Sequence, residues 1–168
     1  MKELIEKAKE LLKEKKVDVV IGYKEDNWRI VPAFIETEQE ADGLIFNDRC
    51  IYNLANYLKW YKNKKVGLIL KGCDAKSINV WLQEFQIKRE NVFIIGMECY
   101  GAVDEKNAGN EFSDKCGYCN VHIPNIYDIL INAKNKPANI EQNSQPFKDI
   151  EELEKMTPEE RWNYWKKQ

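Results

Sequence analysis

Residues 66–74 read VGLILKGCD, and this stretch decides the fold. It begins with a continuous apolar run, the pattern of a strand buried on both faces of a parallel sheet, and ends in a turn at Gly72 and Cys73. Residues 92–96 form a second buried run that ends in a glycine, and Cys99 follows. Between them, residues 77–85 have the apolar spacing of a helix. The sequence therefore predicts a strand, helix and strand unit with parallel strands.

Cysteines follow both of these strands. Of the five cysteines, four lie between positions 73 and 119: Cys73, Cys99, Cys116 and Cys119. Because open α/β sheets bind ligands at the carboxyl ends of their strands, we expect Cys73 and Cys99 at one edge of the sheet. The Cys-x-x-Cys turn can close over them to give four sulfurs, the number that a tetrahedral metal site or an iron–sulfur cluster requires. Iron and zinc both accept four thiolates at this spacing.

Three neighbours are expected to support such a site from its second layer: Lys71, Gly72 and Asp74. Asp74 is predicted to cap the helix, and the positive end of that helix is predicted to lower the pKa of the Cys73 thiol. Lys71 and Asp74 would tune the electronic properties of a bound metal centre. His122 is the one histidine and is expected to form hydrogen bonds rather than bind metal.

An aromatic-rich helix is predicted to open at Asn47 and Asp48. Its aromatic residues indicate core and rim packing, with a flavin or partner surface as the alternative; they are Tyr52, Tyr57, Trp60 and Tyr61. Cys50 lies within this predicted helix, away from the other cysteines, and is expected to be a small buried apolar residue.

The whole chain is predicted to be an α/β protein with a Rossmann-like open, largely parallel sheet and helices on both faces. An N-terminal helix over 3–15 precedes a hairpin of strands 17–23 and 28–35, turning at Asp26-Asn27. Pro32 places the second strand at an edge or at a bulge. Residues 1–131 would form the cysteine-bearing domain. Residues 100–115 are predicted to be a loop, and 123–131 a short helix or strand.

Residues 132–168 are predicted to be a linker followed by C-terminal docking helices. Thr157 and Glu160 have the spacing of a capping box, with Pro158 at the first helical position. Trp162 and Trp165 share one face of this last helix and are expected to anchor a partner, with packing against the chain's own domain as the alternative.

Composition excludes several classes of function. The 168 residues carry 26 basic and 28 acidic side chains with no large basic block, which argues against a nucleic-acid partner. No apolar run approaches the ~20 residues of a membrane span, and the start of the chain lacks the pattern of a signal peptide. We expect a cytoplasmic location, where a Cys-x-x-Cys pair favours metal or redox chemistry over disulfides.

Four stretches resemble one protein family: residues 66–78, 93–101, 116–119 and 156–162. Their order and spacing are similar to the β subunits of deazaflavin (coenzyme F-420) hydrogenases and dehydrogenases, especially the branch associated with iron–sulfur electron transfer in anaerobes. In many relatives the tail helix runs into a ferredoxin-like segment with further cysteines. This sequence ends at Gln168 before any such segment.

The resemblance implies that a 4Fe–4S cluster is held by Cys73, Cys99, Cys116 and Cys119. It also implies that members can bind a flavin such as FAD, and that the partners are other subunits of a redox complex, among them a ferredoxin-like one. No residue stands out as a general base or hydride acceptor. We therefore expect a non-catalytic electron relay of an anaerobic oxidoreductase complex.

Two alternatives stay open beside the iron–sulfur electron-transfer subunit. A flavin-dependent oxidoreductase subunit would release a yellow chromophore on denaturation. A zinc-stabilised adapter with no redox role would use the same four thiolates, or Cys116, Cys119 and His122 with one further ligand.

Overall fold

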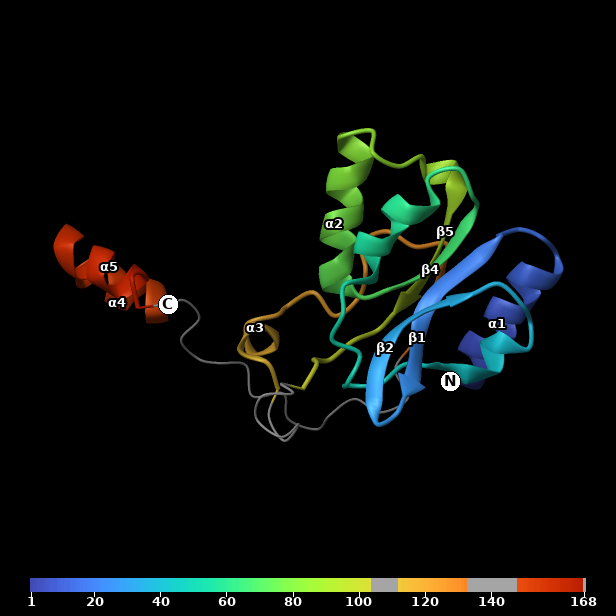
Figure 1. The fold of residues 1–168 in the computed structure, drawn as a ribbon, viewed down its shortest axis with the longest axis horizontal. Coiled ribbons are helices and arrows are strands. Elements are labelled where there is room, and N and C mark those ends of the chain that lie inside the picture. Colours follow the sequence, from blue (N-terminus) through green and yellow to red (C-terminus); the bar gives the residue numbers. More distant parts are fainter. Residues whose placement is uncertain (104–111, 133–147, 168) are drawn as a thin grey trace.

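The structure is a computed structural model and describes residues 1–103, 112–132 and 148–167 (Figure 1). Its centre is a six-stranded sheet in the order β2-β1-β4-β5-β6, with β3 paired to the later part of β1. The strands are β1 (Val19–Asp26), β2 (Arg29–Ile35), β3 (Leu44–Ile45), β4 (Val66–Leu70), β5 (Val92–Met97) and β6 (Ile129–Ile131). β1, β4, β5 and β6 are parallel, so the predicted largely parallel α/β sheet is confirmed.

Helices cover both faces of this sheet. The α-helices are α1 (Lys2–Lys13), α2 (Gly72–Gln83), α3 (Asp114–Gly117), α4 (Lys148–Lys155) and α5 (Pro158–Trp165). Three short 3-10 helices are η1 (Glu40–Gly43), η2 (Leu54–Tyr61) and η3 (Arg89–Asn91). α1 lies on one face, and η2 and α2 lie on the other (Figure 1).

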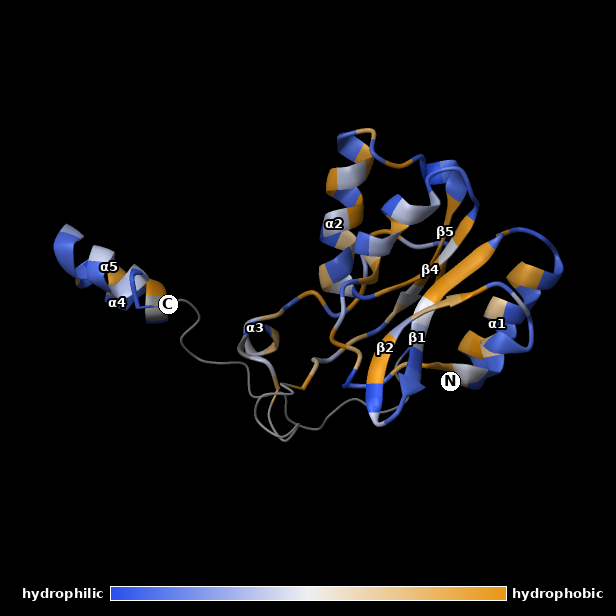
Figure 2. Ribbon diagram, in the orientation of Figure 1, coloured by the Kyte–Doolittle hydropathy of each residue, from blue (hydrophilic) through white to orange (hydrophobic). Residues whose placement is uncertain are grey.

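Burial follows the sequence pattern closely in the centre of the sheet. All five residues of β4 and the first five of β1 are buried, because both faces of these strands are covered. α1 presents Leu4, Ala8 and Leu11 to the sheet at helical spacing. Figure 2 shows the hydrophobic residues concentrated in the strands. Burial of this apolar surface is what drives the chain to form the sheet.

The N-terminal hairpin forms as predicted, with its turn one residue later. Asn27 and Trp28 occupy the turn and both have positive φ, 49° and 50°, which matches the twist of the flanking strands. β2 is an edge strand, which confirms the placement inferred from Pro32.

The helix predicted from Asn47 begins later than expected and is a 3-10 helix, in which Leu54, Ala55 and Leu58 of the predicted apolar stripe are buried. Residues 47–53 form turns, in which the Asn47 side chain accepts a hydrogen bond from the Arg49 N–H, and η2 begins only after Asn53. The Asn53 side chain accepts from the Ala55 N–H and caps η2. Asparagine favoured the local turn over the helix that the apolar spacing suggested.

The later part of the chain agrees in outline. Only 129–131 of the predicted 123–131 segment is a strand. The capping box of Thr157 and Glu160 and the first-turn Pro158 are present in α5. Parts of the predicted loop and linker, residues 104–111 and 133–147, lie outside the described residues, and the proposed division at residue 131 stays a prediction. Within the described ranges, no helix is long and apolar enough to cross a bilayer.

Candidate functional site

Cys73 and Cys99, called here the strand-end pair, lie at the carboxyl edge of the sheet. β4 and β5 pair with Leu70 opposite Gly96, and each cysteine comes three positions after its member of that pair. Cys73 lies in the first turn of α2. Cys99 follows β5 and donates its backbone N–H to the carbonyl oxygen of His122 at 2.9 Å. The register of two parallel strands thus brings both cysteines to one edge.

Cys116 and Cys119, called here the turn pair, lie beside the same edge. The Cys116 sulfur accepts a hydrogen bond from the backbone N–H of Ala102 at 3.2 Å. Val121 lies against the start of α2, where a Cβ added to Gly72 would be 2.1 Å from the Val121 carbonyl oxygen. The absence of a side chain at Gly72 therefore permits the turn pair's segment to approach α2.

Three of these thiols interact electrostatically. Burial raises the pKa of Cys99, and charge on Cys116 raises it further. The pKa of Cys73 is raised to about 12, although part of this residue is exposed to solvent. The largest cause is burial of the thiol, followed by the Asp74 carboxylate, and Cys99 has a smaller effect. The predicted lowering of the Cys73 pKa is wrong, because desolvation and the Asp74 carboxylate raise it by more than the Lys71 charge lowers it.

The donor chemistry of the four thiols fits a metal or a cluster, but their arrangement is not a closed ligand set. In residues 1–103, 112–132 and 148–167, no group of three or more Cys, His, Asp or Glu side chains has a geometry that could hold a metal ion. The two pairs are neighbours at one edge without converging on one point. Ligation by the four sulfurs therefore stays a prediction.

Lys71 forms a buried polar network beside the strand-end pair. Its Nζ donates to the Tyr23 hydroxyl at 2.9 Å and to the carbonyl oxygens of Cys50 and Tyr52 at 2.6 and 2.8 Å. It also lies 3.7 Å from the Asp74 carboxylate. The sequence pointed to Lys71 and Asp74 but missed the other partners, because no local pattern reveals that residues 50–52 fold back to the end of β4.

Asp74 links this network to Cys73. Lys71 is the N-cap of α2 and Asp74 is its third residue, so the predicted capping role of Asp74 is wrong. The Cys73 thiol donates to Asp74 Oδ1 at 3.5 Å, and the buried Oδ2 has no hydrogen-bond partner among the described residues. Burial raises the Asp74 pKa, and the nearby Lys71 opposes that rise.

Cys50 lies closer to the strand-end pair than predicted. It is buried, as expected, but sits in the turn before η2, where its sulfur accepts from the Asn47 N–H at 3.3 Å. Burial raises the pKa of Cys50 to about 11, and charge on Cys99 contributes to that rise.

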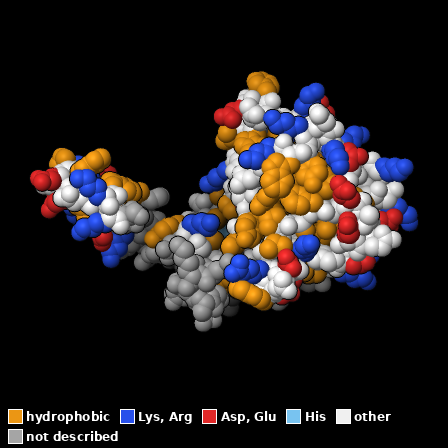
Figure 3. Space-filling model, viewed as in Figure 1, with side chains coloured by type: hydrophobic (Ala, Val, Ile, Leu, Met, Phe, Trp, Pro, Cys, Tyr) orange, Lys and Arg blue, Asp and Glu red, His pale blue; other side chains and the backbone are white. Residues whose placement is uncertain are grey.

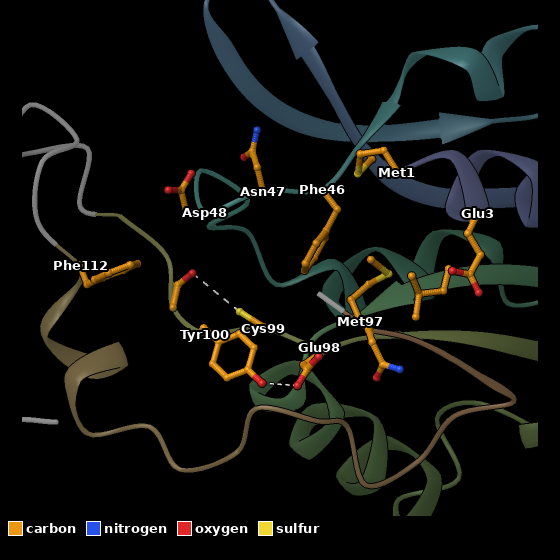
Figure 4. Close-up of a pocket in the computed structure, with 13 residues that line it drawn as sticks. Met1, Glu3, Phe46, Asn47, Asp48, Met97, Glu98, Cys99, Tyr100 and Phe112 are labelled. Carbon is orange, nitrogen blue, oxygen red and sulfur yellow. Dashed lines mark hydrogen bonds between the residues drawn. The ribbon is translucent and has the colours of Figure 1, made fainter. Parts of the chain in front are cut away.

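A cavity of about 450 Å³ opens beside Cys99 at the same edge. Phe46 and Met97 supply an apolar side, whereas Asp48 and Glu98 supply carboxylates (Figure 4). The sequence did not identify these four residues. The rule that ligands bind past the ends of parallel strands could have indicated Met97 and Glu98, which close β5 and precede Cys99.

One wall of the cavity is built by a short polar cluster. The Tyr100 hydroxyl donates to the Glu98 carboxylate (Figure 4), and Glu98 is buried. The Tyr100 ring stacks on His122 with centroids 5.0 Å apart, and His122 Nδ1 lies 3.0 Å from the Cys99 carbonyl oxygen. The expectation that His122 forms hydrogen bonds is confirmed.

The two tail tryptophans are exposed. Trp162 and Trp165 in α5 are 63% and 58% exposed, and the ring of Tyr164 packs edge-on against Trp165. Partner binding by this helix stays a prediction, since a partner chain is not part of the structure.

Comparison with known proteins gives one sequence relative. The chain is 32% identical over 99 residues to the F420-dependent formate dehydrogenase subunit beta of Methanocaldococcus jannaschii, a match that covers 56% of this chain and 26% of the relative. The match thus spans about a quarter of the relative's length. No family model matches the sequence.

A solved structure shares the fold. A chain of the F420-reducing [NiFe] hydrogenase complex from Methanosarcina barkeri aligns with a TM-score of 0.52 and 19% identity, over 64% of this chain and 44% of the other. The sequence relative is itself named as a β subunit of an F420-dependent dehydrogenase, in agreement with the resemblance in the sequence, and the solved structure shows the shared fold.

Proposed function

We propose that this β-subunit-like chain is an electron-transfer subunit, or part of one, in a multi-subunit oxidoreductase, and that Cys73, Cys99, Cys116 and Cys119 hold a 4Fe–4S cluster. The observation that carries the proposal is the position of the strand-end pair and the turn pair at one edge of the sheet. The sequence relative, named as a subunit of an F420-dependent formate dehydrogenase, supports the oxidoreductase role.

A cluster would supply one-electron redox chemistry, and the chain's own part is to gather and shield the ligands. Thiols with raised pKa values, such as Cys73 and Cys99, stay protonated until a metal cation replaces the proton. Cluster assembly on this edge is therefore expected to release protons. The buried Lys71 ammonium beside the site would favour the thiolate charge that the cluster brings.

The proposed partners are other subunits of the redox complex, including a ferredoxin-like protein or domain. The described surface agrees with such a partner at α5, where Trp162 and Trp165 are exposed. Tryptophans are favoured anchors of protein interfaces because they bury much apolar area with few rotatable bonds.

A flavin is the second candidate cofactor. The cavity beside Cys99 has about the volume that small-molecule sites occupy, and it combines an apolar side at Phe46 and Met97 with polar groups at Asp48 and Glu98. A redox-active ring held there would lie next to the strand-end pair. Release of a yellow chromophore on denaturation would identify it.

Anaerobic purification followed by iron, sulfide and zinc analysis tests the proposal. We expect a brown protein that bleaches on reduction and contains iron and acid-labile sulfide. Samples that lose the cluster in air are to be reconstituted before analysis. A colourless protein that takes up one zinc per chain and no iron after reconstitution would contradict the cluster and favour the zinc-stabilised adapter.

Substitution of single cysteines tests the ligand assignment. We expect Cys73→Ala, Cys99→Ala, Cys116→Ala and Cys119→Ala each to abolish cluster retention. Cys50→Ala is the matched control, because Cys50 is a buried cysteine near the strand-end pair whose sulfur accepts a hydrogen bond from the Asn47 N–H. Loss of iron from Cys50→Ala together with retention by Cys99→Ala would refute the assignment.

A further inference from the structure

An aromatic cluster lies on the face of the sheet that η2 covers. Phe34 of β2 contacts the rings of Tyr57, Trp60 and Tyr61, with centroids 5.6 to 5.7 Å apart. Tyr57 and Trp60 also meet edge-on at 5.0 Å. Three of these rings are half-buried, but Trp60 is 61% exposed. Trp60 is therefore a large, mostly exposed apolar side chain that packs against the half-buried rings of Phe34 and Tyr57.

Lysines lie next to this cluster along the chain, and the Lys64 ammonium lies 5.5 Å from the centroid of the Tyr61 ring. Exposed lysines flank Trp60 in sequence and follow η2: Lys59, Lys62, Lys64 and Lys65. Glu36 pairs with Lys64 at 3.2 Å, and the Asp18 carboxylate accepts from the Lys65 N–H at 2.7 Å, whereas the side chains of Lys59, Lys62 and Lys65 make no ion pair within the described parts of the chain. The lysines outnumber these two carboxylates, so this region is locally positive although the chain as a whole has a net charge of −2.

The face seen in Figure 3 displays this arrangement. Hydrophobic side chains gather over η2, and lysine or arginine side chains lie along their border together with some aspartate or glutamate side chains. Since Lys65 directly precedes β4 and the strand-end pair follows the strands, this lysine–aromatic face lies at the opposite end of the sheet from the thiols. It is separate from the proposed cluster site and from the cavity beside Cys99.

We propose that the lysine–aromatic face binds an acidic amphipathic helix of a partner protein. Charge complementarity carries the choice of partner: an apolar centre at Trp60 with a lysine border matches a helix whose apolar stripe is flanked by carboxylates. Trp60 becomes buried when the helix binds and supplies most of the affinity. The lysines orient the helix and speed its association. The proposal does not depend on a cofactor at the thiol edge.

A fluorescent peptide of residues 148–167 serves as the probe, because α4 within it is acidic with apolar Ile150 and Leu153. Binding to the full chain is followed by fluorescence anisotropy. We expect binding that weakens as salt rises, and at least about tenfold weaker binding when Glu151, Glu152 and Glu154 of the peptide are changed to Gln. A 20-base-pair DNA duplex serves as a second probe.

Paired variants locate the binding on the protein. Trp60→Ala and, separately, Lys62→Glu with Lys65→Glu are each expected to weaken binding about tenfold or more. The matched controls are Phe85→Ala, a 92% exposed aromatic residue at the end of α2, and Lys13→Glu, an exposed lysine on α1; both should bind like the wild type. The double lysine variant keeps the test informative if Trp60→Ala fails to fold.

Four outcomes would overturn the proposal. They are binding unaffected by salt or by the Gln substitutions, equal losses in the control variants, tighter binding of the DNA duplex than of the peptide, and no peptide binding by the wild type. The last would mean that the face does not bind an acidic helix.

Discussion

The strand-end pair and the turn pair reach the same edge of the molecule by different means. The sheet register places Cys73 and Cys99, each three positions beyond a residue in the β4–β5 ladder. The turn pair is carried by the short α3 and its following segment, held by contacts such as Cys116 to Ala102. One pair is fixed by many ladder hydrogen bonds and the other by few local ones.

This difference teaches where a metal site is rigid and where it must adapt. The strand-end pair lies beside a fully buried strand and a buried ion pair, whereas residues 112–122, which carry the turn pair, contribute nothing to the hydrophobic core. Because the four thiols do not form a closed ligand set among the described residues, we expect the turn pair to make the larger movement when a cluster binds.

Removal of the Lys71 charge should disrupt the strand-end pair most. Lys71→Met leaves the Cys50 carbonyl oxygen without its donor and the buried Asp74 carboxylate without its neighbouring positive charge, while the Tyr52 carbonyl oxygen keeps the Tyr23 hydroxyl as donor. We expect a loss of about 3–5 kcal/mol in the free energy of unfolding, measured by urea denaturation. Lys16→Met, at an exposed surface lysine, should leave the free energy of unfolding almost unchanged. Equal effects would mean that the buried network contributes nothing.

A methyl group at Gly72 should separate the two pairs. In Gly72→Ala the added Cβ meets the Val121 carbonyl oxygen, so the turn pair's segment must shift away from α2. We expect about 1–3 kcal/mol of destabilisation and loss of cluster retention. Gly43→Ala is the control, because nothing lies within 4 Å of its added Cβ. Full cluster retention by Gly72→Ala would show that the contact is dispensable.

The sequence was sufficient to predict the parallel strands of the sheet, but not the contacts of the residues that pack around its carboxyl edge. Continuous apolar runs and the spacing of Cys73 and Cys99 predicted both the parallel strands and the edge. The raised pKa of Cys73 could not be predicted, because it depends first on the burial of that thiol and then on the Asp74 carboxylate beside it, and both follow from tertiary packing. The helix start predicted at Asn47 was wrong because local side-chain hydrogen bonds competed with apolar spacing.

The buried thiol of Cys50 makes the stability of the chain depend on pH. Its pKa is raised from 9.0 to about 11 by burial, so the folded chain keeps this thiol protonated at a pH where the unfolded chain loses the proton. The protonated Cys50 thiol therefore contributes to the stability of the folded chain below pH 9, and this contribution is lost as the pH rises towards about 11. The free energy of unfolding should fall over this range by up to about 2–3 kcal/mol, and by less in Cys50→Ala. An identical pH profile for the variant would contradict the assignment to Cys50.

The tail should have the smallest effect on the fold. Because Trp162 and Trp165 are exposed, replacing both with alanine should change the free energy of unfolding by less than about 0.5 kcal/mol and leave cluster content unchanged. Thermal melting followed by circular dichroism is the measurement. A drop of several degrees in the melting temperature would show instead that the two rings pack against the chain's own domain.

Mössbauer spectroscopy of the anaerobic protein reconstituted with ⁵⁷Fe tests the central claim most directly, because it identifies the cluster type and counts its irons. We predict the signal of one 4Fe–4S cluster per chain in the wild type and in Cys50→Ala. The signal should be lost alike from Cys99→Ala of the strand-end pair and Cys116→Ala of the turn pair. A full 4Fe–4S signal that survives substitution in either pair would contradict a single cluster shared between them.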